Sequence, residues 1–187
     1  MSGLYLLGVI ALWLWLTRLM WKAWRRGRQA VNADRRRLWN ALAIVAGLLW
    51  FGASFWYGGG RKYYYDWQVE KLCAKDGGVK VYETVRLPAE RFDKYGNVHI
   101  PDKKDAKPED EYYYVSETKY LREGSPKVIR MHTQIIRRND GNVIGESVRY
   151  GRGGGDLPGP WHPSSFTCPS PTEKPYLEPS VFIKGEL

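Results

Sequence analysis

Two long apolar runs occupy the first third of the chain. Residues 1–17 carry no charged side chain, and after Arg18 the apolar character resumes at 19–21. The second run, 38–60, is free of charge throughout. Because about 20 apolar residues cross the ~30 Å hydrocarbon core of a bilayer as a helix, the runs predict a transmembrane helical hairpin over residues 1–60. The first run is long enough if Arg18 extends its side chain to the lipid head groups.

A cleaved signal peptide is the other interpretation of the first run. Such a peptide begins with positive charge and ends in a small-residue cleavage site. Here the chain starts Met-Ser-Gly-Leu-Tyr, bulky residues occupy 14–16 and 19–21, and the positive charge follows the run. The pattern therefore favours a retained transmembrane helix.

Beyond residue 60 the pattern becomes that of a water-soluble domain. Apolar positions recur at helical spacing over 61–76, and Gly77-Gly78 provides a stop. Alternating positions predict a strand over 79–87 and, less regularly, another over 111–122. The segments 127–138 and 143–152 flank a hairpin turn containing Asp-Gly, and short extended pieces are expected at 165–167 and 181–184. The predicted fold class is therefore membrane-anchored α+β, in which 61–187 forms an antiparallel β-meander domain with one short helix.

Basic residues are concentrated between the two apolar runs, where Asp34 is the one acidic residue. They are Arg18, Lys22, Arg25, Arg26, Arg28, Arg35, Arg36 and Arg37. By the positive-inside rule, the loop at about 22–37 is cytoplasmic, and both termini lie on the other side of the membrane. Trp21, Trp24 and Trp39 are expected at the membrane interface, where amphipathic rings prefer to lie.

The basic cluster has two interpretations. It sets the orientation of the hairpin, or it also binds anionic lipid head groups or an acidic cytoplasmic partner, each cation near the surface contributing about 1 kcal/mol. The whole chain has 29 Lys and Arg against 20 Asp and Glu, a net charge of +9. Since most of this excess lies in one short segment between two spans, the charge does not indicate a nucleic-acid partner.

Small residues line part of each span and let helices approach closely. They include Gly8 and Ala11 in the first run and Ala43, Ala46 and Gly47 in the second. Either the two spans pack on each other, or they pack against another membrane protein.

Both cysteines, Cys73 and Cys168, lie in the part expected to be exported. An even number of cysteines in an oxidising compartment predicts a structural disulfide. Redox catalysis is disfavoured because the chain lacks Cys-x-x-Cys and a thioredoxin-like order of elements.

No other motif predicts chemistry. His99, His132 and His162 are far apart and match no zinc-ligand spacing, so no metal or cofactor is expected. The glycine-rich segment 151–155 lacks the Gly-Lys-Ser/Thr of a phosphate-binding loop. Trp161 and His162 form an aromatic loop that either docks a partner or caps the core. No catalytic residue can be assigned.

Two stretches carry a resemblance to known proteins. They are LCAKDGGVKVYE, at 72–83, and YGRGGGDLPGPWHPSSFTCP, at 150–169. Both resemble a family of small, uncharacterised proteobacterial envelope proteins. The resemblance implies a bacterial origin and an exported domain, and it carries no activity, cofactor or catalytic residue.

These features predict a two-pass protein of the bacterial inner membrane with its 61–187 domain in the periplasm. The leading hypothesis is a non-enzymatic accessory, assembly or stabilising subunit of a larger membrane protein complex. Its partners would be anionic membrane lipids and one or more integral membrane proteins. The alternative is a periplasmic ligand-binding or sensing module anchored by the two spans.

Overall fold

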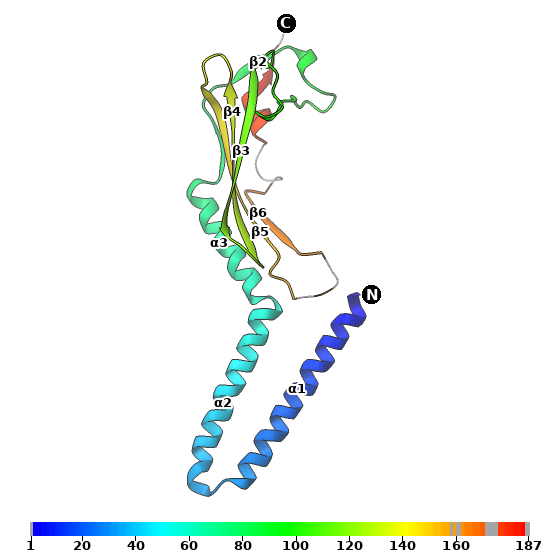
Figure 1. The fold of residues 1–187 in the computed structure, drawn as a ribbon, viewed down its shortest axis with the longest axis vertical. Coiled ribbons are helices and arrows are strands. Elements are labelled where there is room, and N and C mark those ends of the chain that lie inside the picture. The colour runs from blue at the N-terminus through cyan, green and yellow to red at the C-terminus, as the bar shows by residue number, and fades with distance from the viewer. Residues whose placement is uncertain (1, 158, 160–161, 171–175, 186–187) are drawn as a thin grey trace. The chain divides into compact units, whose positions relative to one another are not determined.

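A computed structural model describes residues 2–157, 159, 162–170 and 176–185 of the chain (Figure 1). The chain forms two compact units. The first comprises Met1–Arg61 with Gly155–Pro163, and the second comprises Lys62–Gly154 with Ser164–Leu187. The first unit ends at Arg61, one residue after the domain end expected at residue 60. The sequence pattern gave no sign that Gly155–Pro163 would group with this unit.

The first unit contains two α-helices joined by Val31 and Asn32. α1 spans Ser2–Ala30 and α2 spans Ala33–Phe55. Both helices are long and apolar enough to cross a membrane, and most of their large apolar side chains are exposed. A π-helical turn, η1 (Trp56–Gly60), follows α2, with Gly59 at φ 153°, a conformation that favours glycine.

The basic segment expected as a loop at about 22–37 is largely helical. α1 continues through Lys22, Arg25, Arg26 and Arg28, and α2 begins before Arg35. Lys, Arg, Gln and Ala are good helix formers, so this stretch extends both helices. Arg28 in the last turn of α1 and Asp34 in the first turn of α2 also complement the helix dipoles.

Three indole N–H groups hold the two helices together. Trp13 Nε1 donates to Ser54 Oγ (2.8 Å), Trp50 Nε1 to Thr17 Oγ1 (3.1 Å) and Trp39 Nε1 to the Trp24 carbonyl (3.2 Å). A Cβ at Gly27 would overlap the Trp39 indole, so α2 approaches α1 closely there. The two helices therefore contact each other, but not at Gly8 or Gly47, where an added Cβ would meet no atom within 4 Å.

The second unit is built on an antiparallel sheet. Its strands are β1 (Gly78–Val81), β3 (Tyr112–Arg122), β4 (Lys127–Arg137), β5 (Val143–Gly153) and β6 (Ser165–Cys168). β3, β4 and β5 form the predicted meander. β1 pairs with the first half of β5 and β6 with its second half, so both lie along the edge of β5 opposite β4.

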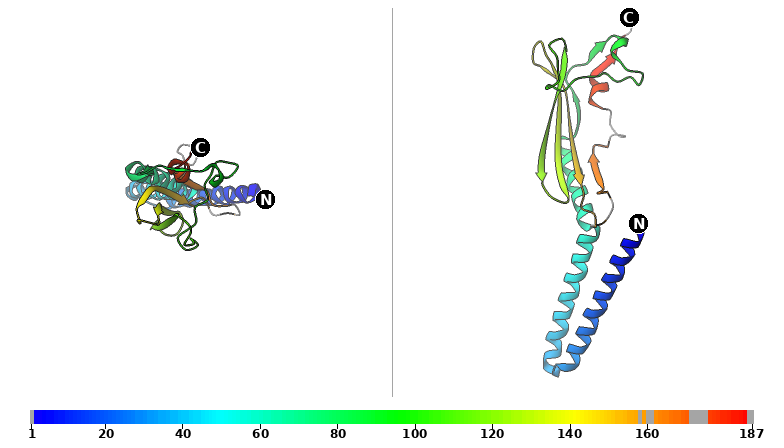
Figure 2. Two further views of the ribbon diagram at one scale, coloured as in Figure 1. Left: turned by 90° about the horizontal axis from the view of Figure 1, so that it is seen from above. Right: turned by 45° about the vertical axis from the view of Figure 1, so that its right-hand side comes forward.

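Two hydrophobic cores stabilise this unit. In one, α3 (Arg61–Asp76) packs Val69 and Cys73 against Val128, Val148 and Tyr150 of the sheet. Figure 2 shows α3 running along the strands. The other core gathers Ile135 and Ile144 of the sheet with α4 (Leu177–Val181), β2 (Val85–Leu87) and β7 (Phe182–Lys184).

Three details of the second unit differ from the predicted elements. The strand expected over 79–87 is divided, because the N–H groups of Tyr82 and Glu83 both bond to the Ile144 carbonyl and the chain then leaves the sheet. β2 pairs in parallel with β7, so the sheet structure is not antiparallel throughout. α4 is a second short helix in a segment where only extended pieces were expected. Alternation of apolar residues continues through such a change of partner and cannot reveal it.

Candidate functional site

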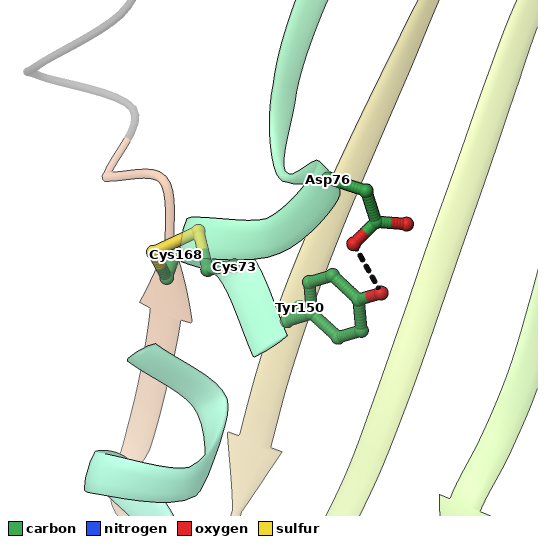
Figure 3. The surroundings of a disulfide bond; sticks show 4 residues. All are labelled: Cys73, Asp76, Tyr150 and Cys168. Carbon is green, nitrogen blue, oxygen red and sulfur yellow. Dashed lines mark hydrogen bonds between the residues drawn. A yellow bond between two sulfur atoms is a disulfide. The ribbon is translucent and has the colours of Figure 1, made fainter. Parts of the chain in front are cut away.

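Cys73 and Cys168 form a disulfide, which confirms the predicted pairing (Figure 3). The register of the sheet explains why they meet. β1, which follows α3, begins opposite Val148, and β6 ends opposite Tyr150. The end of α3 and the end of β6 are therefore brought to the same stretch of β5, and the bond joins segments 95 residues apart.

A buried ion pair fastens α3 to the far end of β5. The Arg152 side chain is 1% exposed, and its Nε lies 2.5 Å from Asp66 Oδ1. Its guanidinium also donates to the Gly154 carbonyl and to the carbonyl and hydroxyl oxygens of Ser164, at 3.1 and 3.0 Å. A charge this deeply buried requires such partners. The arginine therefore joins α3, β5 and the start of β6.

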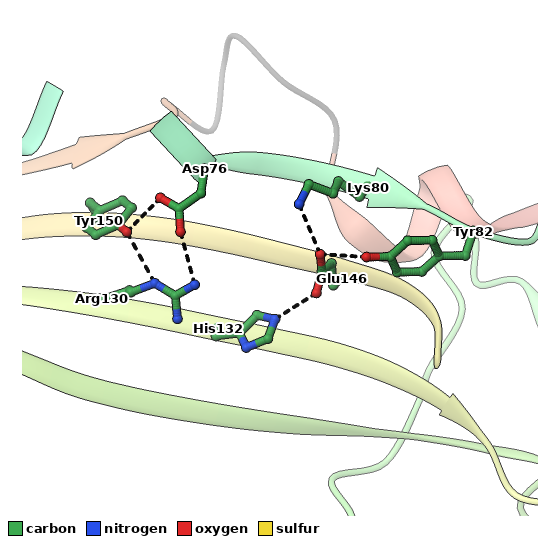
Figure 4. A network of polar contacts seen from close by, with 7 residues as sticks. All are labelled: Asp76, Lys80, Tyr82, Arg130, His132, Glu146 and Tyr150. Carbon is green, nitrogen blue, oxygen red and sulfur yellow. Dashed lines mark hydrogen bonds and ion pairs between the residues drawn. The ribbon is translucent and has the colours of Figure 1, made fainter. Parts of the chain in front are cut away.

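A polar network crosses the sheet around Glu146 of β5 (Figure 4). Its carboxylate accepts hydrogen bonds from the Tyr82 hydroxyl (2.7 Å) and Lys80 Nζ (3.3 Å), and His132 Nε2 lies 3.0 Å from its other oxygen. These contacts, the Tyr82 hydroxyl first, lower the pKa of Glu146 to about 2. A carboxylate whose ionised form is stabilised in this way is a weak proton acceptor, so the Glu146–His132 pair favours a structural role.

A second group of polar side chains lies beside this network (Figure 4). Asp76, at the end of α3, accepts hydrogen bonds from the Tyr150 hydroxyl (2.7 Å) and Arg130 Nη2 (3.1 Å). The bond from Tyr150 is the largest cause that lowers the pKa of Asp76, and burial raises the pKa of Tyr150. Neither group was predicted from the sequence, because the members come from α3, β1, the residue after β1, β4 and β5 and share no local motif.

The low pKa of Glu146 makes the stability of the second unit depend on pH. The folded-state pKa lies below the ordinary value of 4.5, so the stabilisation is present above pH 4.5 and is lost as the pH falls toward about 2. We expect Glu146→Gln to lower the free energy of unfolding by about 1–3 kcal/mol at pH 6 and by much less near pH 2. Urea denaturation at both pH values measures this difference. A pH-independent difference would contradict the assignment.

The predicted membrane-interface residues separate into two groups in the structure. Arg25, Arg28 and Arg36 line a polar hollow of about 300 Å³ together with Trp24 and Gln29. The lining does not include Arg18, Lys22, Arg26, Arg35 or Arg37. The predicted aromatic residues lie close to the hollow, because the Trp21 and Trp24 ring centroids are 4.6 Å apart and Trp39 bonds to the Trp24 carbonyl.

β3 is the last strand of its sheet, and much of its outer edge is open. The N–H and C=O of Tyr114 point away from β4, because they bond to Pro101 and Lys103. In an antiparallel pair these directions alternate, so the backbone groups of Ser116, Thr118 and Tyr120 also point outward. Among the described residues, no backbone hydrogen bond from outside the sheet reaches these three.

The expected docking loop stays a prediction, because only one of its two residues lies in the described part of the chain. His162 is exposed, and Trp161, the other residue of the loop, lies outside the described residues. His132 lies half-buried in β4 and contacts Glu146. Within the described ranges, no group of three or more His, Cys, Asp or Glu is placed to hold a metal ion.

Comparisons with protein-family models, with curated proteins and with solved structures find no match to this chain.

Proposed function

We propose that this chain is a non-enzymatic accessory subunit that supports the assembly or stability of a larger membrane protein complex. In this proposal α1 and α2 span a bacterial inner membrane, the basic segment faces the cytoplasm and the second unit lies in the periplasm. Two apolar helices support the anchor. The disulfide supports the periplasmic location, because such bonds persist in oxidising compartments.

The open edge of β3 is the observation that carries the proposal. Unpaired strand edges bind extended segments of partner proteins by adding a strand, with main-chain hydrogen bonds supplying much of the affinity. Soluble proteins usually shorten, cover or charge such edges to prevent unwanted pairing. Here the outward groups of Ser116, Thr118 and Tyr120 lie beside the exposed side chains of Tyr120 (57%) and Leu121 (43%). An extended segment of a partner subunit fits this edge.

Thr118→Pro tests the edge while sparing the sheet. The N–H of Thr118 points away from β4, so its loss in proline breaks no hydrogen bond of the β3–β4 pair. Proline does block the pairing of a further strand with the outer edge of β3. We expect isolation of the full chain from native membranes in mild detergent to yield a stoichiometric complex. The variant should retain about tenfold less partner. Thr118→Val is the matched control, because it keeps the N–H and a β-branched side chain.

Three results would contradict this proposal. They are recovery of the wild-type chain as a clean monomer, an assembly that contains copies of this chain alone, and equal retention of the partner by both Thr118 variants. Urea denaturation of each variant establishes that the second unit remains folded, so a lost partner can be attributed to the edge.

The orientation is tested independently by cysteine labelling. A cysteine at Gln29, in the basic end of α1, should be shielded from a membrane-impermeant reagent in intact spheroplasts. A cysteine at Asp102, in the second unit, should react. The native cysteines are paired in the disulfide and leave the reporter as the reactive thiol. The reverse pattern would place the second unit in the cytoplasm.

A further inference from the structure

An apolar groove of about 840 Å³ lies between α1 and α2. It extends from Thr17 to Trp24 on α1 and from Trp39 to Phe51 on α2. At 1.5 Å per residue, the α2 wall is about 18 Å long. One leaflet of a ~30 Å hydrocarbon core is about 15 Å deep. The groove therefore has the length of a lipid acyl chain lying within one leaflet, and its volume is in the range of small-molecule sites.

The polar hollow of Arg25, Arg28 and Arg36 adjoins one end of this groove. Trp24 lines both the hollow and the groove, and the Arg28 guanidinium carbon lies 5.6 Å from the centroid of the Trp24 ring. No acidic residue lines the hollow. Among the described residues, none of the three arginines forms an ion pair with a carboxylate. Three arginines that line one hollow without a counter-ion favour binding of a phosphate group.

Two further polar atoms near the junction have no partner. Trp24 Nε1 and Asn40 Oδ1 are shielded from solvent and make no hydrogen bond within the described chain. Both residues line the groove. A buried polar atom left unpaired costs about 1–3 kcal/mol. A small rotation of either side chain would allow it to bond to the glycerol-ester region of a lipid, which lies between phosphate and acyl chain.

We infer that α1 and α2 form a binding site for one anionic phospholipid. Arg25, Arg28 and Arg36 bind its phosphate, and the groove between the helices holds an acyl chain. The site depends on insertion of the two helices in a membrane and is independent of the β3 edge. It differs from general attraction of a basic segment to an anionic surface, because it uses three of the basic residues and not their neighbours.

Native mass spectrometry of the full chain in mild detergent tests the site. Phosphatidylglycerol and phosphatidylcholine with the same acyl chains are the probes. We expect one phosphatidylglycerol to remain bound, with an affinity about tenfold higher than that of phosphatidylcholine. The double variant Arg28→Gln/Arg36→Gln should reduce phosphatidylglycerol affinity about tenfold or more.

The matched control is Arg26→Gln/Arg37→Gln. It removes the same charge from the same two helices, at positions that do not line the hollow. We expect it to change the affinity less than about twofold. Gly47→Leu tests the groove, because a Cβ at Gly47 meets open space and the leucine would occupy part of the acyl-chain path. This variant should also weaken binding while the arginines remain in place.

Five results would overturn the inference. Equal loss of affinity in the two arginine double variants would indicate diffuse attraction, and displacement of the lipid by millimolar glycerol phosphate would indicate a site for phosphate alone. The other three are equal binding of the two lipids, unchanged binding in Gly47→Leu, and recovery of an acidic protein in place of the lipid. Helical circular dichroism of each variant confirms folding, and the Thr118 variants report separately on the proposed subunit function.

Discussion

Replacing both Cys73 and Cys168 with serine is expected to lower the free energy of unfolding of the second unit by about 4–5 kcal/mol. The disulfide joins residues separated by 95 positions, and closing a loop of this length removes much of the entropy of the unfolded chain. A domain of this size is stable by only about 5–15 kcal/mol, so the loss is a large fraction of the total. Urea denaturation of the full chain in detergent, followed by the β-sheet circular dichroism signal, measures it.

Chemical reduction is the matched control for this variant. Reductant should destabilise the wild-type chain by about the same amount and should leave the double-serine variant unchanged. A loss below about 1 kcal/mol in both experiments would mean that the packing of Val69 and Leu72 already holds α3 on the sheet.

Asp66→Asn is expected to destabilise the second unit by about 3–5 kcal/mol. It leaves the Arg152 guanidinium, 1% exposed, without the carboxylate that neutralises it. Removing one partner of a buried ion pair has a cost of this size, because the remaining charge stays in a region of low dielectric constant. The carbonyl and hydroxyl oxygens around Arg152 continue to accept hydrogen bonds but carry no net charge.

A double variant separates the charge from its packing. Asp66→Leu/Arg152→Met removes both charges and keeps apolar volume, and such replacements of buried pairs are often neutral or stabilising. We therefore expect the double variant to be more stable than Asp66→Asn in the same urea experiment. If Asp66→Asn costs less than about 1 kcal/mol, water reaches the guanidinium and the pair behaves as a surface ion pair.

Most of the helices and strands were predictable because their signals are local. An uncharged apolar run marks each of α1 and α2, and alternating residues on both sides of Asp140-Gly141 mark the β4–β5 hairpin. The division of the strand at Tyr82 was not predictable, because it depends on which carbonyl the backbone meets. The missed helix α4 depends on contacts of Leu177 and Val181 with the sheet, including the space left by Gly145.

The sequence predicted a candidate site only where the number of residues of one type was enough to define it. A chain with two cysteines, both expected in an oxidising compartment, predicts a disulfide, since no other pairing exists. By contrast, eight basic residues give no indication that Arg25, Arg28 and Arg36 line one hollow, because their positions depend on how α1 crosses α2. The Glu146 network likewise depends on the register that places β1 and β4 on either side of β5.

Local composition and periodicity thus account for the two apolar helices, the basic segment between them, the strand content and the single disulfide. They do so because hydrophobic spacing and charge are properties of neighbouring residues. Strand register and helix crossing determined the rest: the buried Arg152–Asp66 pair, the open edge of β3 and the arginine hollow beside the groove. These features arise from contacts between residues far apart in the chain, and only the folded backbone specifies such contacts.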